Sequence, residues 1–145
     1  MSRRNYPKHQ SVGGKKQVKC TCDKCGATII AMTRQFNYDP KTHVDVRGIE
    51  CKHCGATYVV SVTDNRVRAL MFRCTEKREE LEKLHKGKKN ESEGYLKSHG
   101  RIPDFVTERW DKKIEQARQE YKAAYRTAIK AANELRVKLG YAPLK

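Results

Sequence analysis

The sequence predicts an α+β protein, in which a small three-stranded antiparallel β module is followed by two long helices forming a helical hairpin or coiled coil. A cysteine motif that occurs twice, β-prone runs around it, and a long heptad pattern towards the C-terminus support this fold class. The chain has 145 residues, of which 37% are hydrophobic and 34% are charged. Small modules with much exposed surface fit this composition better than one large core.

The first segment, residues 1–19, is predicted to be a flexible basic arm. Pro7 and the pair Gly13-Gly14 interrupt any regular element. The segment has no acidic residue, and no apolar stretch follows its arginines, so we do not expect a secretory signal. We also expect no membrane span, because no apolar run approaches the required length. These features predict a cytoplasmic protein. The basic residues of the arm are Arg3, Arg4, Lys8, Lys15, Lys16 and Lys19.

A repeat follows the arm. Residues 22–28 match residues 51–57 at an offset of 29, and each copy reads Cys-x-x-Cys-Gly-Ala-Thr before a β-prone run. Two copies indicate two equivalent halves around one centre, and a solenoid would need more.

Three strands are expected in the module, which spans residues 20–63. The first is predicted over 28–36, the second around 44–47 and the third over 57–62, because each is rich in β-branched or alternating apolar residues. Residues 37–42 form the turn between the first two.

The two Cys-x-x-Cys pairs predict a metal site with Cys22, Cys25, Cys51 and Cys54 as ligands. In a reducing compartment six cysteines are not expected to form disulfides, and the spacing C-x2-C-x25-C-x2-C suits one tetrahedral Zn²⁺. A module of this size buries little apolar area, whereas a structural zinc contributes about 10–16 kcal/mol of apparent binding free energy. Four thiolates leave no open position for a reacting water, so we expect one structural Zn²⁺.

Two alternatives concern the remaining thiols. Cys20 lies two residues before Cys22 and could replace it as a ligand. However, the segment that starts at Cys22 matches the one that starts at Cys51 residue for residue in the Cys-x-x-Cys-Gly-Ala-Thr pattern, and we call each such Cys-x-x-Cys-Gly turn a knuckle. Thiol redox chemistry needs a cysteine at a helix start, whereas glycine and a strand follow each pair here. Cys74 lies on an apolar seam and is expected in the core. The sequence also offers no phosphate-binding glycine loop and no nucleophile–base arrangement, so we expect no enzymatic activity.

The first helix is predicted over residues 64–86. Thr63-Asp64 provides an N-terminal cap. A seam of positions separated by four and three residues runs along it and consists of Leu70, Cys74, Lys77, Leu81 and Leu84. Residues 87–102 are polar and contain Gly87, Gly94 and Gly100, so we predict a linker loop there.

The second helix is predicted over 103–140, from Pro103 to the stop at Gly140. A seam sustained over about three and a half heptads predicts packing against another helix. The partner is either the 64–86 helix folded back or a second copy of the chain, which would make a homodimer through this helix. The seam consists of Trp110, Ile114, Ala117, Tyr121, Ala124, Ala128, Ala131 and Leu135.

The two knuckles resemble those of the zinc-ribbon superfamily, over about residues 18–63. The resemblance rests on Cys22, Cys25 and Gly26 and their counterparts in the second copy, and it implies the fold without an activity. The layout of the chain is a ribbon, then the β-prone segment 58–64, then a charged helix with heptads. This layout is similar to that of small zinc-ribbon proteins encoded by phages of Gram-positive bacteria. That similarity implies a viral regulator in the host cytoplasm. The acidic hairpin pair of transcript-cleavage ribbons is absent, so that role is not implied.

The net charge of +15, from 32 Lys and Arg against 17 Asp and Glu, predicts an anionic partner, nucleic acid first. Beyond the arm, Tyr38 is a candidate for stacking on bases. The outer face of the last helix mixes signs from Lys112 to Lys122, so we assign the basic signal to the arm and the predicted loop. The further candidate contacts are Arg34, Tyr38, Lys41, Arg47, Lys86, Lys88 and Lys89.

The alternative is a protein-binding adaptor or an inhibitor of a host enzyme. It would act through the ribbon and the C-terminal helix, where Trp110 supplies an aromatic anchor. The predicted protein interface consists of Trp110, Ile114, Tyr121 and Leu135.

Overall fold

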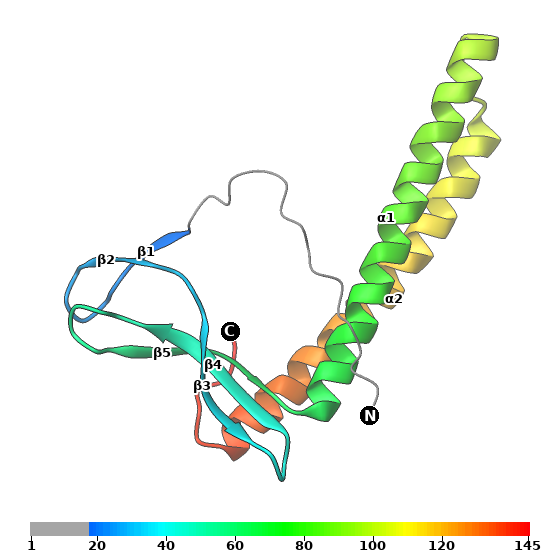
Figure 1. Cartoon of the computed structure of the whole chain (residues 1–145). Helices are drawn as coiled ribbons and strands as arrows, with labels where there is room; N and C mark the ends of the chain where they lie inside the picture. Colours follow the sequence, from blue (N-terminus) through cyan, green and yellow to red (C-terminus); the bar gives the residue numbers. More distant parts are fainter. Residues whose placement is uncertain (1–17) are drawn as a thin grey trace, which may run out of the picture.

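The computed structural model describes residues 18–145 and has the predicted α+β layout (Figure 1). The part of the basic arm that carries Arg3, Arg4, Lys8, Lys15 and Lys16 lies outside the described residues. The elements are β1 (Lys19–Thr21), β2 (Thr28–Ile30), β3 (Arg34–Asp39), β4 (Val44–Glu50), β5 (Thr57–Thr63), α1 (Asn65–His99) and α2 (Asp104–Lys138).

The strands form two antiparallel sheets. β1 and β2 make a short hairpin, and β3, β4 and β5 make a three-stranded sheet in that order. The prediction of one strand over 28–36 is wrong, because β2 ends at Ile30 and β3 begins at Arg34. The chain turns here, with the Met32 N–H donating to the Ile30 carbonyl at 2.8 Å. The break lets β2 pair with β1 while β3 pairs with β4.

The three-stranded sheet has a small core of its own. Val46 of β4 lies opposite Val62 of β5, and both are buried. Next to them, Gly48 leaves room for the Phe36 ring, and any side chain at Gly48 would collide with that ring and with the Tyr58 carbonyl. The glycine is therefore required by a close approach of β3 and β5 to β4.

α1 begins where the sequence predicts and ends later. The Asp64 side chain accepts a hydrogen bond from the Val67 N–H at 2.8 Å, which confirms the cap. The prediction of a linker over 87–102 is wrong: α1 continues to His99 and ends at Gly100, whose φ of 71° is left-handed. Only residues 100–103 connect the two helices.

Contacts from α2 explain why the polar segment after residue 86 is helical. A Cβ at Gly87 would lie 2.6 Å from the Trp110 indole, so the missing side chain makes room for the ring. One turn on, the Glu91 carboxylate accepts hydrogen bonds from Trp110 Nε1 at 2.6 Å and Arg109 at 2.5 Å. Tertiary packing therefore offsets the ~1 kcal/mol helix penalty of a glycine.

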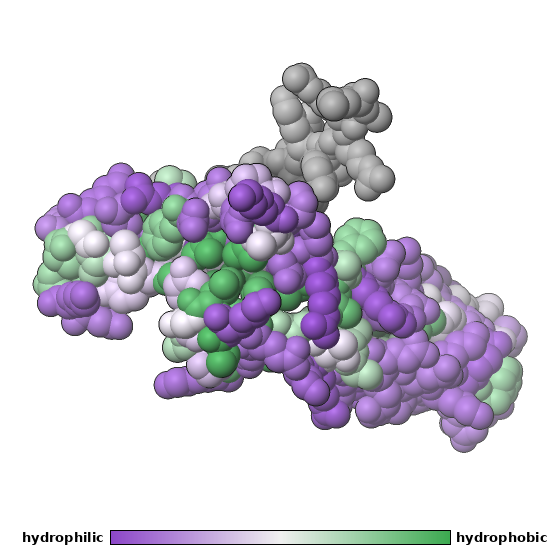
Figure 2. Space-filling model, turned by 90° about the horizontal axis from the view of Figure 1, so that it is seen from below, coloured by the Kyte–Doolittle hydropathy of each residue, from purple (hydrophilic) through white to green (hydrophobic). Residues whose placement is uncertain are grey.

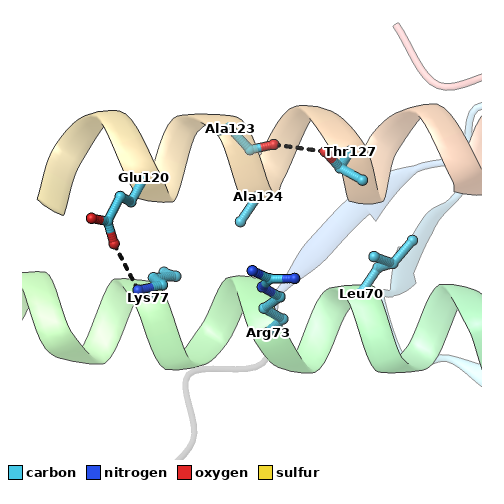
Figure 3. A pocket seen from close by; sticks show the side chains of 7 residues that line it. All are labelled: Leu70, Arg73, Lys77, Glu120, Ala123, Ala124 and Thr127. Carbon is cyan, nitrogen blue, oxygen red and sulfur yellow. Dashed lines mark hydrogen bonds and ion pairs between the residues drawn. The ribbon is translucent and has the colours of Figure 1, made fainter. Parts of the chain in front are cut away.

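α2 packs against α1 as an antiparallel hairpin, so the intramolecular alternative describes the predicted seam (Figure 1). All eight seam positions are buried or half-buried, and three alanines, Ala117, Ala128 and Ala131, are among the buried ones. An ion pair of Lys77 with Glu120, at 2.7 Å, crosses between the helices (Figure 3). Self-association through α2 stays a prediction.

The sheet and the hairpin meet at the end of α2. Arg136 is 6% exposed, and its guanidinium donates to the carbonyls of Val59 and Val60 in β5 and of Ala142 in the C-terminal tail. Figure 2 shows green hydrophobic residues gathered near the middle of the molecule, within a mostly purple surface. Over residues 18–145, neither helix carries the continuous apolar stretch that a membrane crossing needs.

Candidate metal centre

The two halves of the repeat fold into the same tight turn. In each, the carbonyl of the first cysteine accepts the glycine N–H at 2.8 Å, from Gly26 to Cys22 and from Gly55 to Cys51. The N–H of that first cysteine then donates to the alanine that follows the glycine. Gly26 and Gly55 have φ values of 71° and 73°, a region that disfavours residues with a Cβ. The sequence repeat is therefore a repeat of backbone geometry.

The two turns bring the four predicted ligands together. The Sγ atoms of Cys22, Cys25, Cys51 and Cys54 all lie within 4.8 Å of one another. Cys22 and Cys54 are 3.6 Å apart, as are Cys25 and Cys51, so each close pair joins one turn to the other. Metal–sulfur bonds of about 2.3 Å in a tetrahedron place the sulfurs about 3.8 Å apart. The cluster therefore fits a single four-coordinate ion.

The cluster contains Cys22 and not Cys20. Cys20 lies in β1 opposite Ile29 and packs, half-buried, against the apolar side of the cluster. Cys22 and Cys51 are buried at 1% and 0% exposure, whereas the second cysteine of each turn is exposed. The centre thus has its first cysteines in the module core and its second cysteines at the surface.

Tyr58 connects the two turns outside the sulfur cluster. Its hydroxyl lies 3.1 Å from Cys22 Sγ and accepts the Asp23 N–H at 3.2 Å, so the hydroxyl proton is free to point at the sulfur. The Tyr58 hydrogen bond, with help from backbone N–H groups, lowers the pKa of the Cys22 thiol to about 6. The same bond raises the pKa of Tyr58 to about 12. The arrangement favours a thiolate at Cys22, which is the form that binds metals.

Sequence reasoning missed this role, because it placed Tyr58 only within a predicted strand. The available signal was a break in the repeat: the equivalent residue in the first copy is Ile29, which is buried in the core. A polar group at one of two equivalent positions marks the place where the halves differ.

The predicted nucleic-acid contacts in the sheet are largely engaged within the fold. Arg34 pairs with Glu50, and Arg47 Nε lies 2.8 Å from an Asp45 oxygen. The hydroxyl of Tyr38, whose ring is 45% exposed, is 3.1 Å from His43 Nδ1 near the β3–β4 turn. The side chains of Lys41, in that turn, and Lys19, in β1, are exposed.

The three lysines of the predicted loop lie on α1 instead. Lys88 pairs with Asp111 of α2 at 2.5 Å, and Lys89 is 3.9 Å from Glu93. Lys86 is exposed. The structure therefore does not gather these lysines into a loop cluster, and their binding of nucleic acid stays a prediction.

The four predicted protein-interface residues face α1 of the same chain or lie at the edge of the seam. Trp110 contacts Gly87, Ile114 is 5% exposed, and Leu135 packs on the cluster around Val67. Tyr121 is half-buried. The seam that suggested a partner surface is thus used between the two helices.

Among residues 18–145, the four cysteines are the one group of three or more His, Cys, Asp or Glu side chains placed to share an ion. Comparison with protein-family models, curated proteins and solved structures finds no match.

Proposed function

We propose that this chain is a non-enzymatic nucleic-acid-binding protein whose N-terminal module is a zinc ribbon held by one structural Zn²⁺. The observation that carries the metal is the cluster of four sulfurs within 4.8 Å. Tetrahedral all-sulfur sites select zinc or iron–sulfur centres, and two short knuckles around one point suit a single zinc ion.

A closed shell defines what the metal does. Four thiolates occupy a tetrahedral ion completely, so no position is left for a water that could attack a substrate. The ion instead joins two turns that are 25 residues apart in the chain. Its role in this proposal is to hold the module in one conformation.

Charge supports nucleic acid as the partner. All 17 acidic residues lie between 18 and 145, whereas five of the 32 basic residues lie in 1–17. The arm therefore has no negative charge to offset its own, and the folded part still has an excess of positive charge. Such a balance attracts phosphates over long range. Near the β3–β4 turn, Tyr38 precedes Lys41 by three residues and both are exposed, which suits stacking beside a phosphate contact.

The metal is tested by composition and thiol reactivity. We expect one zinc per chain by elemental analysis and four thiols that react with a thiol reagent only after chelation. Cys20→Ser should keep the zinc, whereas Cys22→Ser should lose it. An iron–sulfur absorption spectrum, or full thiol reactivity in the untreated protein, would contradict the proposal.

Nucleic-acid binding is tested by fluorescence anisotropy with labelled single-stranded DNA, duplex DNA and RNA over a salt series. Binding that weakens steeply with salt, and weakens again when residues 1–17 are removed, is the expected result. No binding at moderate salt would overturn the proposal. The alternative, an adaptor or inhibitor that binds a protein through the ribbon and α2, would then be tested with the same protein.

A further inference from the structure

We propose that the exposed face of α2 between residues 121 and 133 binds single-stranded nucleic acid. Three cations lie there at intervals of four residues: Lys122, Arg126 and Lys130, here named the α2 basic row. All three are exposed. With a rise of about 1.5 Å per residue, they follow one another about 6 Å apart along one side of the helix. This inference rests on the proposed function and locates its contact surface.

The row is distinguished by three successive cations on one side of the helix with no acid between them. Residues 121–133 contain no acid. Within the part of the chain that the structure describes, no ion pair involves any member of the row. In contrast, Arg78 pairs with Glu82 and Arg118 pairs with Glu115. The sequence indicates a face of mixed charge from Lys112 to Lys122, and the last acid of that stretch is Glu120.

The groove next to the row carries a further cation. Ala123 and Thr127, which follow Lys122 and Arg126 in the chain, line a space between the helices (Figure 3). Arg73 of α1 extends into this space towards Ala124, and no acid pairs with it among residues 18–145. The one acid that lines this space, Glu120, is paired with Lys77 at 2.7 Å, so Arg73 adds positive charge to the groove beside the row.

Apolar surface beside the row favours bases that are not stacked in a duplex. Tyr125 is 51% exposed and directly precedes Arg126. Ile129 and Val137 line a shallow depression together with Arg126, Lys130 and Glu134, and the Glu134 carboxylate lies 3.8 Å from the Arg66 guanidinium of α1. An aromatic face interleaved with cations is the usual arrangement for binding single strands, where rings contact bases and cations contact phosphates. A duplex would offer the phosphates alone to such a helix face.

The test compares two triple variants of the full chain that remove the same charge. The row variant is Lys122→Gln, Arg126→Gln and Lys130→Gln. The control variant is Lys83→Gln, Lys97→Gln and Lys112→Gln, three exposed helix positions that also lack an ion pair among the described residues. Every substituted side chain is exposed, so we expect both variants to fold as the unmodified chain does. Unchanged circular dichroism would verify this.

Anisotropy with short labelled single-stranded DNA and RNA gives the dissociation constant over a salt series. On a single strand each phosphate contact contributes about 0.7 to the slope of log affinity against log salt concentration. Loss of three contacts should therefore reduce the magnitude of this slope by about 2 and weaken binding at least tenfold near 0.1 M salt. The control should keep the slope of the unmodified chain. Tyr125→Leu should weaken binding about fivefold or more at every salt concentration without changing the slope.

The outcomes separate the two proposals. If the unmodified chain binds but the row and control variants behave alike, the row is overturned and the proposed function stands. If the unmodified chain binds no nucleic acid, the proposed function fails and the row fails with it. If polyglutamate competes as well as the single strand at equal charge, the surface recognises acidic polymers generally, and single-stranded nucleic acid is overturned as its partner.

Discussion

The N-terminal module and the helical hairpin are built on different sources of stability. The apolar cluster of the module contains four buried residues, Cys22, Ile29, Cys51 and Ala56, and two of these are candidate metal ligands. The hairpin buries a seam along two helices of 35 residues each. Apart from the small core at Val46 and Val62, the apolar packing of the module surrounds its candidate metal site and depends on the ion, whereas a hairpin with continuous side-chain packing does not.

The largest effect that this comparison predicts is the response to loss of one ligand. Cys51→Ser should unfold the module, because an ion worth about 10–16 kcal/mol of apparent free energy is no longer held. The hairpin should stay helical, because its seam, including the cluster around Val67, lies within the two helices. Its side-chain hydrogen bonds to the module come from Arg136, to β5, and from Arg68, to Thr63 and the His43 carbonyl. Hydrogen exchange would show fast exchange in β1–β5 and retained protection in α1 and α2. Cys74→Ser is the control, and loss of helical circular dichroism in Cys51→Ser would break the division.

The next effect concerns the hydrogen bond that makes the two knuckles unequal. Tyr58→Phe removes the hydroxyl 3.1 Å from Cys22 Sγ and leaves the ring in place. Loss of such an outer contact typically lowers metal affinity about 10- to 100-fold, so a competing chelator should remove zinc more readily. In the cobalt-substituted protein the sulfur-to-metal charge-transfer band should shift, because an uncapped thiolate donates more charge. Tyr38→Phe should change neither, and an unshifted band in Tyr58→Phe would exclude a contact to the bound sulfur.

Two glycines of α1 test whether side-chain packing between the helices stabilises the hairpin. At Gly87 a methyl group would lie 2.6 Å from the Trp110 ring, whereas at Gly94 it would meet nothing within 4 Å. Gly87→Ala should therefore destabilise the hairpin by about 1–3 kcal/mol through overpacking. Gly94→Ala should stabilise it by up to ~1 kcal/mol through helix propensity. Urea unfolding followed by helical circular dichroism measures both, and equal stabilisation by the two would show that Trp110 does not pack at Gly87.

The chemistry of the two seams explains why the sequence predicted the α2 seam but missed the end of α1. The α2 seam is made of side chains that are apolar or aromatic, so its spacing is visible in one segment alone. Beyond Leu84 the α1 seam continues through Lys88, Glu91 and Tyr95, which are half-buried. Lys88 and Glu91 acquire their partners, Asp111 and Trp110, only when α2 is in place. A polar seam satisfied by a distant segment resembles a loop in the sequence.

The metal site was predictable for the opposite reason. Its ligands, its glycines and its spacing are all local, and the repeat identifies them twice. The repeat marked Tyr58 only as a difference between its two copies and did not indicate the contact of its hydroxyl with Cys22, 36 residues earlier in the chain. The sequence also did not indicate the ion pairs of Arg34 with Glu50 and of Arg47 with Asp45. Both arginines were therefore predicted to contact nucleic acid, although their charges are paired within the sheet.

The smallest predicted effect is the pH dependence of the hairpin. The Trp110 indole N–H, and next the Arg109 guanidinium, hold the pKa of Glu91 below its ordinary value. A lowered pKa in the folded state means that the stabilisation is present above the unfolded-state pKa, about 4.3. It is lost as the pH falls through the folded value. Urea unfolding of the helices between pH 7 and pH 3 should therefore show a decline at acidic pH that is shallower in Glu91→Gln.

Other carboxylates also become protonated in this range, so the difference between Glu91→Gln and a control carries the result. Glu93→Gln is the matched control, because its carboxylate only faces Lys89 at 3.9 Å on the same helix. If Glu91→Gln and Glu93→Gln follow the same pH profile, the Glu91–Trp110 contact does not stabilise the distal end of the hairpin. If only Glu91→Gln flattens the profile, a polar pair holds together the segment that the sequence alone presented as a loop.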